Sequence, residues 1–299
     1  MTVLHHHRPA TRALAPFAAA ALLLLGACSS DGSDAKAATT TEAAPAGSTT
    51  TAAGPTDSTT TTAAPASEPL KILVSNDDGY SAEGISTLVD GLQTLDDVEV
   101  TVVAPLDQRS GTGGKTTEGT LAVSDVELKS GFAAKAVDGF PADTIRAAYD
   151  DLGLDPDLVI TGINEGQNLG PLVNASGTVG AARAAVARGV PALATSSGLG
   201  QPVDYDAAVP FVLDWVKQHR EAIEAGDEPA AVTNLNVPSC ATGEVRDLVE
   251  TETDLDGKAG DALKGTQDCS GTDPADEAAG DITEFTAGFA TLSPVSANP

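Results

Sequence analysis

Short apolar runs alternate with amphipathic stretches along the chain from about residue 69 onward. Leu70–Ser75 and residues 98–104 are apolar runs rich in β-branched side chains, which predicts two buried strands. Residues 84–95 between them place four large apolar side chains on one helical face: Ile85, Leu88, Val89 and Leu92. A strand, a helix and a second strand in this order predict a right-handed unit with parallel strands.

The same alternation continues through most of the remaining sequence. Further helices are predicted at residues 142–152, 178–188 and 206–224. Further strands are predicted at residues 157–161, 191–195 and 231–237, with a last one near 282–292. Residues 121–128 and 133–137 alternate more weakly and predict a hairpin or side layer. We therefore expect an α/β fold, Rossmann-like and three-layered, with an open, mostly parallel sheet and helices on both faces.

The first 27 residues have the features of an export signal. Arg8 and Arg12 precede an apolar run at residues 13–25, which is too short to span a membrane as a mature helix. The run ends in Leu-Gly-Ala-Cys, which resembles the bacterial lipoprotein box, in which Cys28 is lipidated and becomes the new N-terminus. An ordinary cleaved signal with a chance cysteine is the alternative interpretation.

Residues 28–68 consist mainly of Thr, Ala, Ser, Pro and Gly. Such a segment buries too little apolar surface to offset its ordering entropy, so we predict a disordered tether. The folded domain is then expected at residues 69–299, with residues 239–280 as an irregular, acidic, glycine-rich part. A lipidated Cys28 would hold this domain at the outer face of the bacterial cell membrane.

The net charge of the chain narrows the range of binding partners. Removing residues 1–27 would leave 14 basic and 43 acidic side chains, a net charge of −29. This charge argues against nucleic-acid polymers and anionic lipid headgroups as partners, and leaves the lipid anchor as the only membrane contact. It is typical of surface solvation or of adaptation to salt.

Cys240 and Cys269 form an even pair in an exported protein, which predicts a disulfide, with two free thiols as the alternative.

Polar residues follow three of the predicted strands. These runs are Asn-Asp-Asp-Gly at 76–79, Gln-Arg-Ser-Gly at 108–111 and Gly-Ile-Asn-Glu-Gly-Gln-Asn at 162–168. In open parallel sheets the ligand binds where such loops converge, beyond the carboxyl ends of the strands. Asp77 and Asp78 are adjacent like charges that resist burial without a cation, donors or water. Because the runs offer oxygen and amide ligands but no histidine or cysteine, they favour Mg²⁺, Mn²⁺ or Ca²⁺ over zinc.

A second feature opens the helix predicted at residues 178–188. Residues 174–180 read Asn-Ala-Ser-Gly-Thr-Val-Gly, and free amides at a helix start beside hydroxyl groups suit a phosphate. Ser176 could equally be a helix cap. A cation site and a phosphate cradle at one sheet edge together indicate phosphoryl chemistry.

The chain resembles the SurE survival-protein family of metal-dependent 5′/3′-nucleotidases. The resemblance covers about residues 70–238, with a weaker return at 281–294, and rests on ILVSNDDGYSAEGI, VTVVAPLDQRSG, GFPADTI, PDLVITGINEGQNLG, SGTVGAARAAVARGVPALA and NLNVP. It implies a divalent cation, with the metal ligands Asp77, Asp78, Ser110 and Asn164. It also implies phosphate contacts from Ser110, Gly111, Asn168, Ser176, Gly177 and Thr178.

By this resemblance we expect hydrolysis of nucleoside monophosphates, and in some members of short polyphosphate, with Asp77 or Asp78 orienting or deprotonating the attacking water. Members of the family usually carry a longer segment after the NLNVP motif, which contributes to their dimer and to the nucleoside side of the pocket. The expectation of a homodimer and the base preference are therefore open here. Two alternatives remain: a surface lipoprotein that binds nucleotide or phosphate with impaired catalysis, and a purely structural surface protein.

Overall fold

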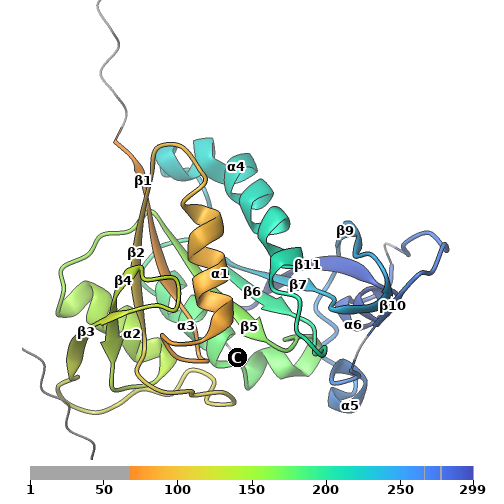
Figure 1. Cartoon of the computed structure of the whole chain (residues 1–299), viewed down its shortest axis with the longest axis horizontal. Helices are drawn as coiled ribbons and strands as arrows, with labels where there is room; N and C mark the ends of the chain where they lie inside the picture. The colour runs from red at the N-terminus through yellow and green to blue at the C-terminus, as the bar shows by residue number, and fades with distance from the viewer. Residues whose placement is uncertain (1–67, 266, 277, 299) are drawn as a thin grey trace, which may run out of the picture. The chain divides into compact units, whose positions relative to one another are not determined.

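The computed structural model describes residues 68–265, 267–276 and 278–298. The predicted signal peptide, the lipidation at Cys28 and the tether up to residue 67 lie outside this part. Within it, nine strands form one sheet (Figure 1). In spatial order they are β3 (Val123–Glu127), β4 (Ala133–Val137), β2 (Val98–Pro105), β1 (Leu70–Ser75), β5 (Leu158–Glu165), β6 (Ala192–Ser197), β7 (Val232–Val237), β11 (Phe289–Val295) and β9 (Arg246–Glu250).

The sheet is parallel through its centre. Strand β1 pairs in parallel with β2 and β5, and β6 pairs in parallel with β5 and β7. The β3–β4 and β7–β11 pairs are antiparallel. The predicted open, mostly parallel sheet and the weak hairpin are thus confirmed. The hairpin is not a side layer, because β4 also pairs with β2 and extends the main sheet.

Helices cover both faces of the sheet, which confirms the three layers. Helices α1 (Glu83–Leu92) and α4 (Val209–Ala225) lie side by side on one face in Figure 1 and share a core with Ile72 and Val74 of β1. Helices α2 (Pro141–Asp150) and α3 (Gly177–Val186) pack on the other face, in a second core that includes Leu73. Within the described residues, every helix is too short or too polar to cross a membrane.

The segment after β7 is more ordered than we predicted. Residues 239–280 contain β9, β8 (Cys240–Gly243), α5 (Ala259–Ala262) and β10 (Gln267–Cys269). Strand β9 pairs with β11, β8 pairs with β10, and Cys240 and Cys269 form a disulfide whose Cα atoms are 5.6 Å apart. The segment is therefore only partly irregular, because these short elements interrupt it. These elements have three to five residues each and are too short to show periodicity, so pairing with distant strands decides their structure.

Two further boundaries differ from the prediction. The strand expected near 282–292 begins only at Phe289, because residues Asp281–Thr286 form helix α6. The buried Asp281 carboxylate accepts hydrogen bonds from the amides of Gly170 and Asp254, at 2.9 and 3.0 Å. Strand β5 extends to Glu165, so Asn164 lies in the strand and not in the following loop.

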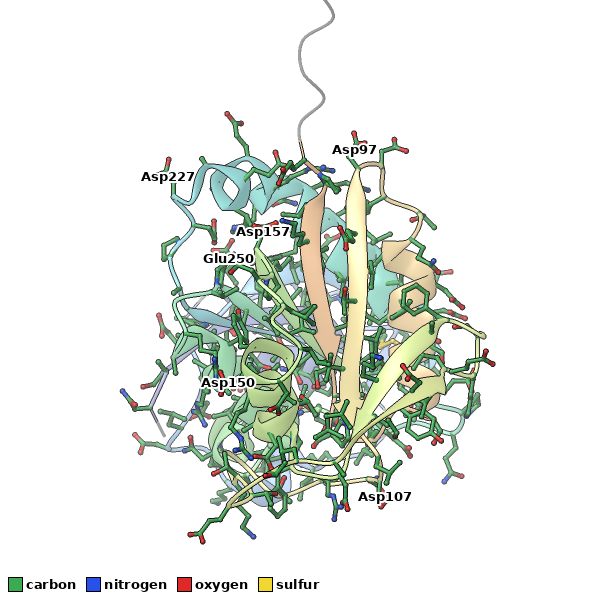
Figure 2. The ribbon with its side chains drawn as sticks, turned by 90° about the vertical axis from the view of Figure 1, so that its left-hand side faces the viewer. Asp97, Asp107, Asp150, Asp157, Asp227 and Glu250 are labelled. Atoms are coloured by element: carbon green, nitrogen blue, oxygen red, sulfur yellow. A yellow bond between two sulfur atoms is a disulfide. The ribbon has the colours of Figure 1, made fainter. Side chains whose placement is uncertain are left out.

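Acidic side chains occur at both ends of the sheet. Figure 2 shows Asp97 and Asp157 near the end where β1 begins, and Asp107 at the opposite end. Asp107, at the carboxyl-end side of β2, is strongly exposed. The acidic surface is therefore not confined to the sheet edge that carries the predicted site.

Candidate active site

The turn after β1 holds the two adjacent aspartates. The Asn76 side chain fixes this turn, since its Nδ2 donates to the Gly79 carbonyl at 2.9 Å and its Oδ1 accepts from the Gly79 amide at 3.2 Å. Asp77 is buried, with 3% of its surface exposed, and Asp78 is half-buried. The strand thus ends in a fixed turn that presents two carboxylates at the carboxyl edge of the sheet.

Asp77 lies against the first turn of α3. The Thr178 hydroxyl donates to Asp77 Oδ1 at 2.6 Å. A Cβ added at Gly177 would lie 2.8 Å from Asp77 Oδ2, so this approach requires glycine. Burial raises the pKa of Asp77, and the hydrogen bond from Thr178 opposes that shift. The start of α3 therefore holds this carboxylate in place.

Asp78 is held by Glu165 at the end of β5 and by Gln108 in the loop after β2. Its Oδ2 accepts from the Glu165 amide at 3.0 Å, and its Oδ1 lies 3.5 Å from Gln108 Nε2. Burial and then the neighbouring charge of Asp77 raise the pKa of Asp78 to about 6. Since nearby positive charge favours the ionised form of both carboxylates, this pair suits a bound cation.

A cavity of about 220 Å³ lies beside this pair. Its lining comes from the loops after β1, β2 and β6, the end of β5 with the residues that follow it, the start of α3 and the end of α5. The lining residues are Asp77, Ser110, Gly111, Asn164, Glu165, Gly166, Gln167, Asn168, Leu172, Ala175, Ser176, Leu199 and Leu263.

The cavity brings most of the residues implied by the resemblance together. Six of them line it: Asp77, Ser110, Gly111, Asn164, Asn168 and Ser176. Asp78 adjoins the cavity through its hydrogen bond to Glu165, which is a lining residue. Gly177 and Thr178 do not line it. Both lie behind Asp77, so the structure gives them contacts with that carboxylate where the resemblance implied contacts with phosphate.

Hydrogen bonds orient the amide and hydroxyl groups of the cavity. Asn164 Nδ2 donates to the Gly166 carbonyl at 2.5 Å, which leaves Oδ1 available to a cation. The Ser176 hydroxyl accepts from the Val179 amide at 3.1 Å and so caps α3. Because a capping hydroxyl still has its own hydrogen to donate, Ser176 can be a cap and a phosphate contact at once.

The donor set fits a hard divalent cation. Carboxylates, a hydroxyl and a carboxamide oxygen are the ligands that Mg²⁺, Mn²⁺ and Ca²⁺ prefer. The described residues contain no cluster of three or more His, Cys, Asp or Glu that could hold a metal. No lysine or arginine is among the described residues that line the cavity. Arg183 and Arg146 are bound instead to backbone carbonyls and to Asn174 and Asp143.

The sequence assigned no individual role to several residues at or beside the cavity, although Gln108 lies in the polar run 108–111. Gln108 lies 3.5 Å from Asp78 and 3.4 Å from the Ser110 hydroxyl, and so bridges two candidate ligands. Its position beside Ser110 was the only available signal. Leu199 and Leu263 follow β6 and α5, and no pattern in the sequence connects them with the site.

Fold and site together define an open α/β protein with an oxygen-donor site beyond the carboxyl ends of a parallel sheet. The chain belongs to the SurE family, since the family model "Survival protein SurE" matches residues 72–256. It is 38% identical over 187 residues to a protein named 5′-nucleotidase SurE from Brevibacillus brevis, covering 60% of this chain and 71% of that protein. It is 42% identical over 192 residues to one of the same name from Halobacterium salinarum, covering 60% and 70%.

A solved structure agrees with this assignment. The crystal structure of the SurE protein from Aquifex aeolicus superposes with a TM-score of 0.60 at 26% identity, over 76% of this chain and 94% of that one. The similarity therefore extends over most of the described part of the chain.

Proposed function

We propose that this protein is a metal-dependent phosphomonoester hydrolase that releases phosphate from nucleoside monophosphates. The relatives named 5′-nucleotidase SurE support the reaction class. The observation that carries the proposal is the placement of Asp77, Ser110, Asn164 and Ser176 around one cavity that has no basic side chain among its described lining residues. A phosphate dianion beside two carboxylates needs a cation between them.

The chain's own residues would hold this cation and the phosphoryl group. Asp77, Asp78, Ser110 and Asn164 supply oxygen ligands, and the bound cation would neutralise phosphate charge and polarise the phosphoryl group. Ser176 lines the cavity, and its hydroxyl hydrogen is placed to be donated to a phosphate oxygen. Asn168 lines the same cavity, and its backbone is held by Asn234 and Asn236 of β7, so its position is fixed before substrate binds.

Asp78 is the better placed of the two aspartates for handling the attacking water. Thr178 and Gly177 enclose the Asp77 carboxylate, whereas Asp78 is half-buried and its carboxylate reaches the amide of the cavity-lining Glu165. A carboxylate that water can reach can orient that water and accept its proton. We therefore assign the orientation and deprotonation of water to Asp78.

We further propose that the enzyme works outside the cytoplasm, anchored by a lipid on Cys28. The charged, apolar and small-residue segments before Cys28 support export. The Cys240–Cys269 disulfide is consistent with an oxidising compartment. Labelling cells with a radioactive fatty acid tests the anchor, because Cys28→Ala should abolish incorporation into this chain.

The first experiment is phosphate release from AMP, GMP, CMP, UMP and p-nitrophenyl phosphate, with Mg²⁺, Mn²⁺ or EDTA, by the wild-type chain and Asp78→Asn. We expect metal-dependent release that the substitution lowers by at least about a hundredfold, as for loss of a catalytic acid or base. Asp90→Asn, an exposed carboxylate on α1, is the matched control and should leave the rate unchanged.

The result also separates the alternative functions. Nucleotide and metal binding without any release would support a binding lipoprotein. One observation favours that alternative, since the family model ends at residue 256 while the cavity is completed by Leu263. Absence of both release and metal-dependent thermal stabilisation would contradict the hydrolase and the binding protein alike.

A further inference from the structure

Gln167 is a buried amide in the candidate site with every polar atom of its side chain engaged. It is 4% exposed and lies between the candidate ligands Asn164 and Asn168. Its Oε1 accepts from the Leu199 amide at 2.8 Å. Its Nε2 donates to the carbonyls of Ala262 and Lys264, both at 2.9 Å. One carboxamide thus joins three separate segments of the chain.

All three segments contribute to the cavity wall. Gln167, Leu199 and Leu263 line the same cavity as Asp77 and Ser110. Leu263 directly follows α5 and lies between the two residues whose carbonyls Gln167 binds. Its side chain is 53% exposed, so burial of the leucine alone does not hold it in place.

Helix α5 needs outside support. It has four residues, and a helix of one turn is unstable in isolation because nucleation costs more than its few hydrogen bonds return. Gln167 supplies support on the side of the cavity. Gln267, two residues before the disulfide-bonded Cys269, donates from Nε2 to the carbonyls of Lys264 and Gly265, so the Lys264 carbonyl accepts from both glutamines. The end of α5 is therefore held between Gln167 and the disulfide-bonded strand β10.

We propose that Gln167 is a positioning residue that fixes the end of α5 as a wall of the active site and thereby sets the affinity for the ester part of the substrate. The inference rests on the proposed function and adds to it the residue that holds the end of α5 at the cavity. The clamp joins Gln167, inside the region matched by the family model, to Ala262, which lies beyond residue 256.

The size and chemistry of the cavity indicate which part of a substrate this wall meets. At about 220 Å³, the cavity is smaller than the roughly 300–1,000 Å³ typical of small-molecule sites. It can enclose the phosphoryl group and the first part of the ester, while the rest extends past the rim. Leu199 and Leu263 present apolar surface without fixed donors or acceptors, so contact there contributes binding but little discrimination between bases.

The test is Gln167→Met, which keeps the length of the side chain and removes its hydrogen bonds. The substitution leaves the Ala262 carbonyl and the Leu199 amide without their partner and removes one of the two donors to the Lys264 carbonyl. We expect the Kd for AMP, measured by calorimetry with Mg²⁺, and the KM to rise roughly tenfold, with kcat within about threefold of the wild type. Gln218→Met, at an exposed position on α4, is the matched control and should change neither quantity.

Hydrogen exchange provides a readout that does not depend on turnover. We expect the amides of residues 259–265 to exchange faster in Gln167→Met, while those of β1 and β5 keep their protection. Leu263→Ala is a second variant that removes the exposed side chain and leaves the clamp intact. It should raise the Kd and KM in the same direction without faster exchange.

Each outcome bears on the inference separately from the proposed function. Faster exchange at residues 259–265 with unchanged Kd and KM would overturn it, because the clamp would then be structural only. A fall in kcat with unchanged KM would also overturn it. If the wild type binds AMP but releases no phosphate, the hydrolase proposal fails, and the Kd and exchange measurements still decide the role of Gln167. If Gln167→Met does not fold, an unchanged Kd for Leu263→Ala would overturn the assignment of this wall.

Discussion

Asp77 shows how much a single carboxylate of the candidate site depends on its neighbours. Its position in the turn is evident from the sequence, but its contacts come from residues 100 positions away in the chain. The Thr178 hydroxyl donates to Asp77 Oδ1 at 2.6 Å, and both residues are buried. The Thr178 carbonyl also accepts from the Thr161 hydroxyl at 2.9 Å, which ties the start of α3 to β5. Thr178 therefore supports the site from behind without touching the cavity.

Thr178→Val tests this support. The substitution keeps the shape of the side chain but leaves a buried Asp77 oxygen without its donor, which should lower the free energy of unfolding by about 1–3 kcal/mol. We also expect phosphate release to fall, because Asp77 loses its fixed orientation. Thr178→Ser keeps the hydroxyl and should retain most of the activity. Equal activity of the valine and serine variants would show that the hydrogen bond has no part in the reaction.

At the scale of elements, the start of α3 is the meeting point of the site. The loop that carries Ser110 and Gly111 crosses this helix at close range. The Gly113 amide donates to the Ala175 carbonyl at 2.9 Å, and a Cβ at Gly180 would lie 2.1 Å from the Gly113 carbonyl oxygen. The glycine in the helix is therefore required by the loop that crosses it, and the packing of the two elements positions Ser110 over the cavity.

Gly180→Ala should separate the loop from the helix. Because the new methyl group meets backbone that cannot rotate away, we expect a loss of stability of about 1–3 kcal/mol together with a lower rate of phosphate release. Gly260→Ala in α5 is the matched control, since a Cβ there meets nothing within 4 Å. Denaturant unfolding of both variants measures the difference. A Gly180→Ala protein as stable and active as the control would contradict the close packing.

At the scale of the whole molecule, the described part of the chain consists of a central α/β core and a C-terminal segment that extends its sheet. Strand β11 continues the sheet antiparallel to β7, and β9 follows at the edge. The disulfide then closes a loop between Cys240 and Cys269, 29 residues apart in sequence. This loop includes α5, so the disulfide closes the same segment that completes the cavity.

Removal of the disulfide should destabilise the protein markedly. For a loop of this length the restriction of the unfolded chain is worth about 3–4 kcal/mol. The double variant Cys240→Ser/Cys269→Ser should therefore unfold at a lower denaturant concentration than the oxidised wild type. Adding a reductant should lower the unfolding midpoint of the wild type and leave that of the double variant unchanged. Equal midpoints for the oxidised wild type and the double variant would contradict the prediction.

The sequence by itself determined the central sheet, its layers and the candidate chemistry. Long apolar strands and amphipathic helices such as Leu70–Ser75 and Glu83–Leu92 have periods that local sequence reveals, and parallel strands place their following loops at one edge. The polar runs that contain Asp77, Asp78, Ser110 and Asn164 were identifiable for that reason, and the resemblance to the SurE family implied which of their residues are metal ligands.

Only the tertiary structure decided how the cavity is completed. Residues 239–280 contain short elements whose order depends on pairing with β11, on the disulfide and on the amide of Gln167. Thr178 and Gly177 could likewise be placed at a helix start, but their contact with Asp77 required the packing of α3 against β1 and β5. Contacts between residues far apart in sequence leave no periodic signal, so the wall formed by Leu263 became apparent only in the folded chain.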